Sequence, residues 1–142
     1  MKFDTLETKK LILRKLTQEV YDHIYTKCEI DVQMRLLGLG TISELDTERL
    51  KYTQGLSMFN KDFLIFQLLD KAGEKIIGWC GYHTWYKQHE RAEIGYSISD
   101  DKFKRKGIMA EALSSVIEYG FSIMKLNRIE AFIGPNNMAS IK

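Results

Sequence analysis

The sequence predicts an α/β domain in which helices pack on a mixed sheet. Short apolar runs alternate along the chain with segments of helical periodicity. Residues 91–99 alternate between apolar and polar side chains, and residues 107–124 form a strongly amphipathic helical pattern. The 142 residues suffice for one core, since domains commonly hold roughly 100–150 residues. We therefore take residues 1–142 as a single domain.

The first elements are a strand and two helices. Residues 11–16 (LILRKL) are rich in branched apolar side chains, which favours a strand. Thr17 is placed to cap a helix over residues 17–28. A second helix is predicted over residues 43–59, where Ser43 precedes an aspartate by three residues and so resembles a capping box.

The middle of the chain predicts strands. Residues 63–69 (FLIFQLL) form a nearly continuous apolar run, and a turn-like segment separates them from a strand over residues 76–86. These two strands should form an antiparallel hairpin. In the next strand, residues 91–99, one face carries the apolar side chains Ala92, Ile94, Tyr96 and Ile98. That face should contact a core.

The C-terminal part begins with the amphipathic helix over residues 107–124, which should pack on the sheet. A strand over residues 128–133 and a turn follow, and Asn137 could cap one more helix. Only about five residues remain for that helix, too few to offset the cost of nucleation. We therefore expect the domain to be incomplete at its C-terminal end.

Composition narrows the class of protein. Twenty-one basic and 19 acidic residues give a net charge of +2, too balanced to favour nucleic acid or a membrane surface as a partner. No segment reaches the roughly 18 apolar residues of a membrane span, and the N-terminus lacks a signal-peptide pattern, so a cytoplasmic location is expected. Cys28 and Cys80 form neither a disulfide framework nor a CxxC motif.

The segment most suited to chemistry is the basic loop at residues 100–107, which enters the predicted helix at Gly107. Free amides of a first helical turn bind anions, and a glycine lets the backbone approach a phosphate closely. The sequence has neither a GxxxxGK[ST] nor a GxGxxG motif, so the common ATP and dinucleotide fingerprints are absent. A solvated charged turn remains the alternative interpretation.

Three segments in order resemble the RimJ/RimL-like branch of the GNAT N-acetyltransferases: Ala92 to Tyr96 (AEIGY), Lys106 to Leu113 (KGIMAEAL) and Leu126 to Ala131 (LNRIEA). The resemblance implies the GNAT acyl-CoA N-acyltransferase fold, with antiparallel N-terminal strands and a central sheet that splays at the cofactor site. Similar proteins continue with a further helix and two strands. A surface left open by their absence could be covered by a second copy, which makes a homodimer an expectation.

The resemblance also implies an acetyl-CoA site. The family pattern Gln/Arg-x-x-Gly-x-Gly/Ala begins at Lys104, and the sequence departs from it there and at Met109. Late backbone groups of the strand over residues 91–99 would bind the pantetheine arm. The residues implied to bind the cofactor are Ile98, Lys104, Arg105, Lys106, Gly107, Ile108, Met109, Ala110 and Asn137.

Acetyl transfer to an amine requires removal of a proton, because a free alkylamine is mostly protonated at neutral pH. Glu93 is the main candidate for the base, although it could equally be a structural carboxylate paired with Arg91 or Lys87. His83 is a second candidate. Ser140 is the residue left to protonate the departing CoA thiolate, as the resemblance implies. The three histidines show no metal-ligand spacing, so no metal is expected.

The resulting prediction is an N-acetyltransferase that uses acetyl-CoA as cosubstrate. Its acceptor would be a primary amine, either a protein N-terminus or a small molecule, attacking directly within a ternary complex. The alternative is a truncated, non-catalytic module that binds CoA or a partner. A nucleic-acid binder using residues 102–106 would need a wider basic patch than the charge balance suggests.

Overall fold

The computed structural model describes residues 3–53, 62–72, 75–98 and 107–131. Within these ranges the strands are β1 (Thr5–Glu7), β2 (Leu11–Leu16), β3 (Asp62–Asp70), β4 (Ile76–Tyr86), β5 (Arg91–Ile98) and β6 (Arg128–Ala131). The helices are α1 (Gln18–Lys27), α2 (Ile30–Leu37), α3 (Ile42–Thr53) and α4 (Ile108–Ser122), with a short 3₁₀ turn at Lys87–His89.

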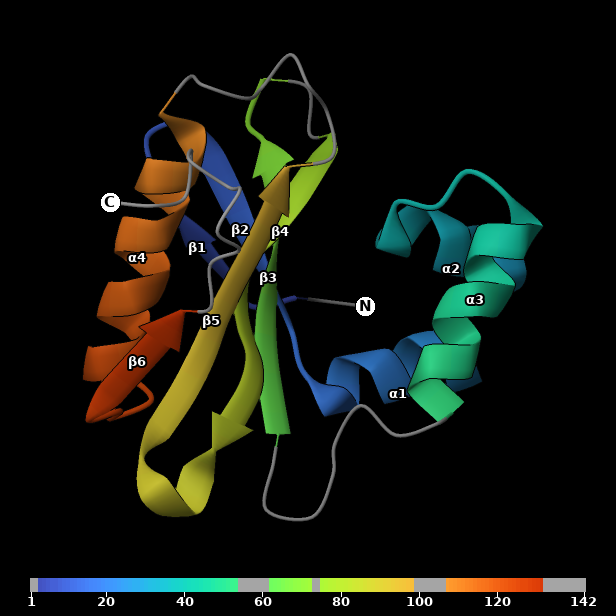
Figure 1. The fold of residues 1–142 in the computed structure, drawn as a ribbon. Helices are drawn as coiled ribbons and strands as arrows, with labels where there is room; N and C mark the ends of the chain where they lie inside the picture. Colours follow the sequence, from blue (N-terminus) through green and yellow to red (C-terminus); the bar gives the residue numbers. More distant parts are fainter. Residues whose placement is uncertain (1–2, 54–61, 73–74, 99–106, 132–142) are drawn as a thin grey trace, which may run out of the picture.

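The described strands form one six-stranded sheet in chain order, β1 to β6. Strands β1 to β5 pair antiparallel with their neighbours. Strand β6 pairs parallel with β5, and α4 makes the crossover between them (Figure 1). The predicted mixed sheet and α/β fold class are therefore confirmed.

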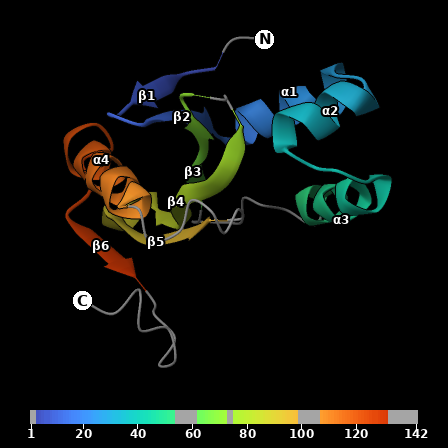
Figure 2. The ribbon, with the colours of Figure 1, turned by 90° about the horizontal axis from the view of Figure 1, so that it is seen from above.

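Helix α4 packs on one face of the sheet, and α1 to α3 lie on the other side (Figure 1). Seen from above, the sheet curves around α4, with β1 and β6 at its two ends (Figure 2). The core lies between α4 and the strands. Its fully buried side chains include Leu11, Leu13, Phe66, Tyr82 and Val116.

One buried hydrogen bond fastens α4 to the centre of the sheet. The Tyr82 hydroxyl on β4 donates to the Val116 carbonyl of α4 at 2.6 Å. The ring has room because Gly120, one turn further along the helix, carries no side chain. Burial raises the pKa of Tyr82, so this phenol stays neutral. The contact fixes the height of α4 over the sheet.

Several predicted elements occur as expected. Strands β2 and β4 have the predicted bounds, and β3 with β4 forms the predicted antiparallel hairpin. Helix α1 begins after Thr17, whose side chain accepts from the Val20 amide at 3.4 Å. Helix α4 begins one residue after Gly107 and has the predicted amphipathic character, because Ile108 and Val116 are buried in the core.

The predicted start of the helix at residue 43 is wrong. Helix α3 begins at Ile42, and its capping box joins Thr41 and Glu44: the Glu44 amide donates to Thr41 Oγ1 at 3.1 Å, and that hydroxyl donates to Glu44 Oε1 at 3.1 Å. Ser43 lies inside the helix, where its carbonyl accepts from Thr47. Residues 54–59 of the predicted helix lie outside the described ranges.

The sequence interpretation missed two elements, β1 and α2. Strand β1 has only three residues and is defined by its pairing with β2. Helix α2 begins after Glu29 without a side-chain cap and ends at Gly38, whose φ of 71° is left-handed. Across the described ranges, the helices fall short of the length and apolar character that crossing a bilayer would require.

Candidate cofactor and catalytic site

The N-terminus of α4 has no side-chain cap from the residues that the structure describes. Gly107 is the N-cap residue, with φ 73° and ψ 4°. This left-handed conformation is strained for most residues with a Cβ, so it favours glycine here. Among the described residues, nothing lies within 4 Å of the position that a Cβ would take. The space beside Gly107 on its Cβ side is therefore unfilled by the described residues.

The three residues after Gly107 have different environments. Ile108 is 5% exposed and anchors the start of the helix in the core, and Met109 packs partly against it. Ala110 is exposed. The first intrahelical bond joins the Glu111 amide to the Gly107 carbonyl at 3.1 Å. The amides of residues 108–110 thus precede the hydrogen-bond ladder, as in any helix N-terminus suited to an anion.

Five of the predicted site residues lie outside the described ranges. They are Lys104, Arg105, Lys106, Asn137 and Ser140. The basic part of the loop, the second cofactor contact and the predicted proton donor remain predictions from the sequence. Of the predicted cofactor loop, the structure describes the part from Gly107 to Ala110.

Ile98 is the last described residue of β5 and pairs with Gly78 of β4. A Cβ on Gly78 would collide with the Ser97 carbonyl and lie 3.0 Å from Ile98 Cα, so this end of the β4–β5 pair requires glycine. The parallel pairing of β5 with β6 runs from Arg91 to Ile94, and β6 is described to Ala131. The predicted splay beyond that point concerns residues that the structure does not describe.

Glu93 lies on β5 between Ala92 and Ile94, whose side chains enter the core beneath α4. Because side chains alternate along a strand, Glu93 points to the opposite face. It is half-buried, and its Oε2 accepts a hydrogen bond of 3.4 Å from the Tyr86 hydroxyl. A carboxylate with this exposure can reach a ligand on that face.

The cations that were proposed as partners of Glu93 contact other carboxylates. Lys87 Nζ lies 2.7 Å from Asp62 Oδ2, and Arg91 Nη1 lies 3.5 Å from Glu130 Oε1. Arg91 also stacks over the Tyr86 ring, 4.3 Å from its centroid. The sequence interpretation missed Tyr86, whose position opposite β5 depends on strand register.

His83 lies at a bulge in β4. The register with β5 shifts between Tyr82 and Thr84, which leaves His83 as the extra residue. A Cβ on Gly95 would lie 2.8 Å from His83 Cδ2, so the imidazole covers that glycine. Gly95 shares a strand face with Glu93, so both base candidates lie on the side away from α4.

An aromatic cluster joins α1, α3 and the start of β3. Tyr25 stacks on Tyr52 with 4.6 Å between ring centroids, and Tyr21 packs on Phe63. The Tyr52 hydroxyl donates to Asp22. Burial raises the pKa of Tyr25 to about 12, so it is a neutral phenol at physiological pH. The sequence interpretation did not identify this cluster, because its members come from three separate segments.

A cavity of about 700 Å³ lies between α2 and the strands at the β1 edge of the sheet. Arg14 lines it and is held by Gln67 Oε1 at 2.9 Å and by the Leu36 carbonyl at 3.1 Å. Burial lowers the pKa of this guanidinium. The described residues that line this cavity include none from β5 or α4.

The two cysteines lie in different environments. Cys80 is fully buried on β4, and burial raises its pKa to about 12, whereas Cys28 at the end of α1 is half-buried. In the part of the chain that the structure describes, His, Cys, Asp and Glu do not gather in groups that could hold a metal ion.

Comparison with known sequences gives the family. The Acetyltransferase (GNAT) domain matches residues 10–142. The N-acetyltransferase YoaA of Bacillus subtilis (strain 168), described as uncharacterized, is 32% identical over 148 aligned residues, covering 97% of this chain and 78% of the relative. N-acetyltransferase p20 of Bacillus licheniformis, also described as uncharacterized, is 32% identical and covers 98% of this chain and 78% of its own length.

Solved structures show the same fold. A GNAT-family acetyltransferase from Bacillus anthracis is 27% identical with a TM-score of 0.59, covering 96% of this chain and 77% of the other. RimL, a ribosomal L7/L12 alpha-N-protein acetyltransferase solved with coenzyme A, is 14% identical with a TM-score of 0.64. The match covers 96% of this chain and 78% of the RimL chain. With a mixed sheet, a helix that begins at the left-handed Gly107 and this family match over residues 10–142, the chain belongs to the GNAT acetyltransferases.

Proposed function

We propose that this protein binds acetyl-CoA at the N-terminus of α4 and transfers the acetyl group to a primary amine. The observation that carries the proposal is Gly107, which enters the helix at positive φ, with no described residue within 4 Å of where a Cβ would project. A phosphate needs close backbone approach and free first-turn amides, and this turn offers both. The family match supports the cosubstrate.

The residues fit a CoA pyrophosphate and pantetheine arm. Gly107 and the amides of Ile108, Met109 and Ala110 would bind the pyrophosphate, with Lys104 to Lys106 supplying positive charge. The end of β5 at Ile98 would bind the pantetheine arm, and Asn137 would add a second polar contact. When bound, acetyl-CoA would supply an acetyl group activated as a thioester.

Glu93 is the proposed general base. It lies on the face away from α4, is partly exposed, and is oriented by the Tyr86 hydroxyl. It would accept the proton that the acceptor ammonium loses, directly or through a water molecule. Ser140 would return a proton to the departing thiolate. His83 remains an alternative base on the same face.

Direct transfer in a ternary complex is proposed over an acyl-enzyme. Formation of an acyl-enzyme requires a reactive nucleophile, and a thiol is nucleophilic as the thiolate. The buried Cys80, with a pKa raised to about 12, is protonated at neutral pH and closed to substrate. This argues against an acyl-enzyme on Cys80 and supports attack by the amine itself, with both substrates bound together.

The acceptor class is proposed as a protein N-terminus or a small primary amine. RimL, which shares the fold, is described as a ribosomal L7/L12 alpha-N-protein acetyltransferase. An N-terminal peptide therefore belongs in the acceptor screen beside polyamines and aminoglycosides. A cytoplasmic location is part of the proposal.

The first test is a calorimetric titration of the chain with acetyl-CoA, with the oligomeric state recorded by light scattering. Gly107→Glu should weaken binding roughly 100-fold, because two unit charges about 5 Å apart repel by about 3 kcal/mol at an effective dielectric of about 20. Gly38→Glu is the matched control, since Gly38 also has positive φ, 71° against 73°, but ends α2.

Three outcomes are informative. Micromolar binding that Gly107→Glu weakens roughly 100-fold while Gly38→Glu does not supports the cofactor site, and turnover of an amine then tests the enzyme itself. Binding without turnover of any amine would favour the non-catalytic module. No binding by a folded wild-type chain refutes the proposed function. Glu93→Gln should lower turnover near neutral pH with cofactor affinity unchanged, and an unaltered pH–rate profile would reject Glu93 as the base.

A further inference from the structure

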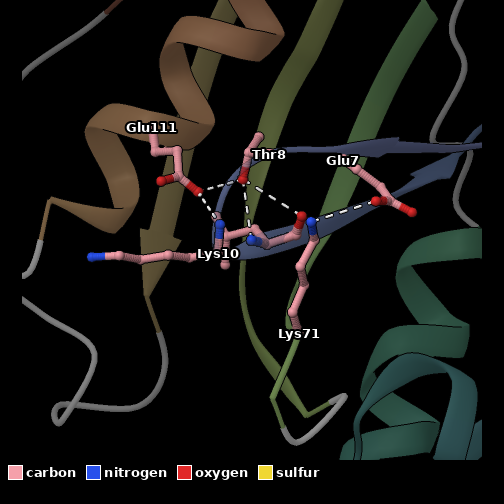
Figure 3. Close-up of polar contacts among 6 residues, drawn as sticks. Glu7, Thr8, Lys10, Lys71 and Glu111 are labelled. Atoms are coloured by element: carbon pink, nitrogen blue, oxygen red, sulfur yellow. Dashed lines mark hydrogen bonds and ion pairs between the residues drawn. The ribbon is translucent and has the colours of Figure 1, made fainter.

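Glu111 joins the first turn of α4 to the turn between β1 and β2. Its Oε2 accepts from the Thr8 hydroxyl and, at 2.9 Å, from the backbone amide of Lys10 (Figure 3). Both donors converge on one carboxylate oxygen. Glu111 is four residues beyond Gly107, and its own amide closes the first helical bond of α4. The contact therefore acts on the start of the helix.

The β1–β2 turn is itself held in place. The Thr8 amide donates to the Leu11 carbonyl at 2.9 Å, and the Leu11 amide donates to Thr8 Oγ1 at 3.1 Å. The Lys10 carbonyl accepts from the Lys71 amide at 3.1 Å, which ties the turn to the end of β3. Lys71 Nζ also lies 3.4 Å from Glu7 Oε2, an ion pair drawn in Figure 3. Glu111 thus binds a turn fixed at two further points.

We infer that Glu111 is a positioning residue for the cofactor site, holding the first turn of α4 against the β1–β2 turn so that the amides after Gly107 keep one orientation. The inference rests on the proposed function, since it assigns Glu111 a part in CoA binding. It adds residues from the N-terminal hairpin to a site otherwise built from β5, α4 and the loop between them.

Hydrogen bonds and neighbouring positive charges together lower the pKa of Glu111 by more than burial raises it. Partial burial of the side chain raises the pKa of Glu111. The hydrogen bonds from Thr8 and Lys10, with the charges of Lys10 and Lys9, lower the pKa more, and it falls below the ordinary value. Glu111 is consequently ionised at neutral pH, and its charge is committed to the turn while the helix N-terminus faces the cofactor.

The experiment compares three variants of the full chain. Glu111→Ala removes both bonds, whereas Glu111→Gln keeps an oxygen that can accept from both Thr8 and Lys10. Glu118→Ala is the matched control, since Glu118 is an exposed glutamate on the same helix. The Kd for CoA is measured by calorimetry, the unfolding midpoint by circular dichroism, and hydrogen exchange at the amide of residue 111 by NMR.

We expect Glu111→Ala to weaken CoA binding about tenfold, which is the scale of one charge-assisted hydrogen bond. The same variant should exchange the amide hydrogen of residue 111 faster. Glu111→Gln should restore the affinity to within about twofold, with Glu118→Ala unchanged. A lower unfolding midpoint with unaltered Kd would overturn the inference by showing a purely structural role. If wild type fails to bind CoA, the proposed function falls, and unchanged exchange in Glu111→Ala still refutes the positioning role.

Discussion

Replacing Gly120 with alanine tests how α4 is fixed on the sheet. A Cβ at Gly120 would lie 2.9 Å from Tyr82 Cζ and 3.1 Å from Ile129 Cδ1, and closer still to the Tyr82 hydroxyl. Tyr82 is fully buried and hydrogen-bonded to Val116, so its ring has no free space into which it can move. We expect the substitution to push the ring and α4 apart.

The expected cost is the sum of three terms. Overpacking a core costs about 1–3 kcal/mol, and loss of the Tyr82 hydrogen bond inside the core costs about 1–3 kcal/mol. Alanine gains about 0.5–1 kcal/mol over glycine within a helix. A net loss of about 3 kcal/mol follows, which corresponds to about 9 °C in the unfolding midpoint at about 3 °C per kcal/mol.

Denaturant unfolding of a double-mutant cycle measures this coupling. Tyr82→Phe alone should lower the free energy of unfolding by about 1 kcal/mol. The Val116 carbonyl loses the phenol as a donor but keeps its backbone hydrogen bond within the helix. In that background Gly120→Ala should cost at least about 1 kcal/mol less than in wild type, since the closest atom is gone. Equal costs in both backgrounds, or a stabilising Gly120→Ala, would refute the packing argument. Ser114→Ala, an exposed α4 site, controls for helix propensity.

Three further predictions concern single side chains. The pKa of Glu111 is lowered in the folded state. Its contribution to stability is therefore present above the unfolded pKa of about 4.3 and is lost as pH falls through the folded pKa. In Glu111→Gln, the free energy of unfolding should depend less steeply on pH in this acid range. Cys80, buried with a pKa near 12, should resist thiol reagents at neutral pH until the chain unfolds, and a Cys28→Ala variant that labels rapidly in native buffer would contradict this. Thr41→Ala should lower the free energy of unfolding by about 1 kcal/mol, because it removes the α3 cap. Ser43→Ala should have little effect on thermal unfolding and serves as the control.

Local patterns predicted the elements that carry their own signal. Strand β5 alternates over a buried face, and α4 has apolar residues at helical spacing, so each could be recognised without its neighbours. Helix α2 has no side-chain cap at Glu29 to mark its start. It ends at Gly38, a residue type common just after helices, which has positive φ in the structure. Strand β1 is three residues with two exposed, and it exists through pairing with β2. No local pattern specifies such a strand.

The residues of the candidate site also fall into those with a local sequence signal and those without one. Gly107 was predicted from a basic loop that enters a helix, which is a local signal, and the structure gives it the left-handed conformation that glycine permits. The contact between Thr8 and Glu111 joins residues 103 positions apart. Tyr86 reaches Glu93 because a 3₁₀ turn returns the chain antiparallel along β4. Both contacts depend on register and packing, which residue spacing alone does not determine.

The orientation of β5 bears on how two substrates could bind together. Its buried side chains face α4, so Glu93 faces the side on which α1 and α2 lie (Figure 2). Ile98 is five residues further along, or about 16 Å at roughly 3.3 Å per residue. A cofactor held at Gly107 would therefore enter from the end of the strand, and an acceptor amine would approach Glu93 from the α1 to α3 side. With the proposed sites separated in this way, both substrates would bind together, so initial-rate plots against both substrates should intersect, whereas parallel lines would indicate an acyl-enzyme.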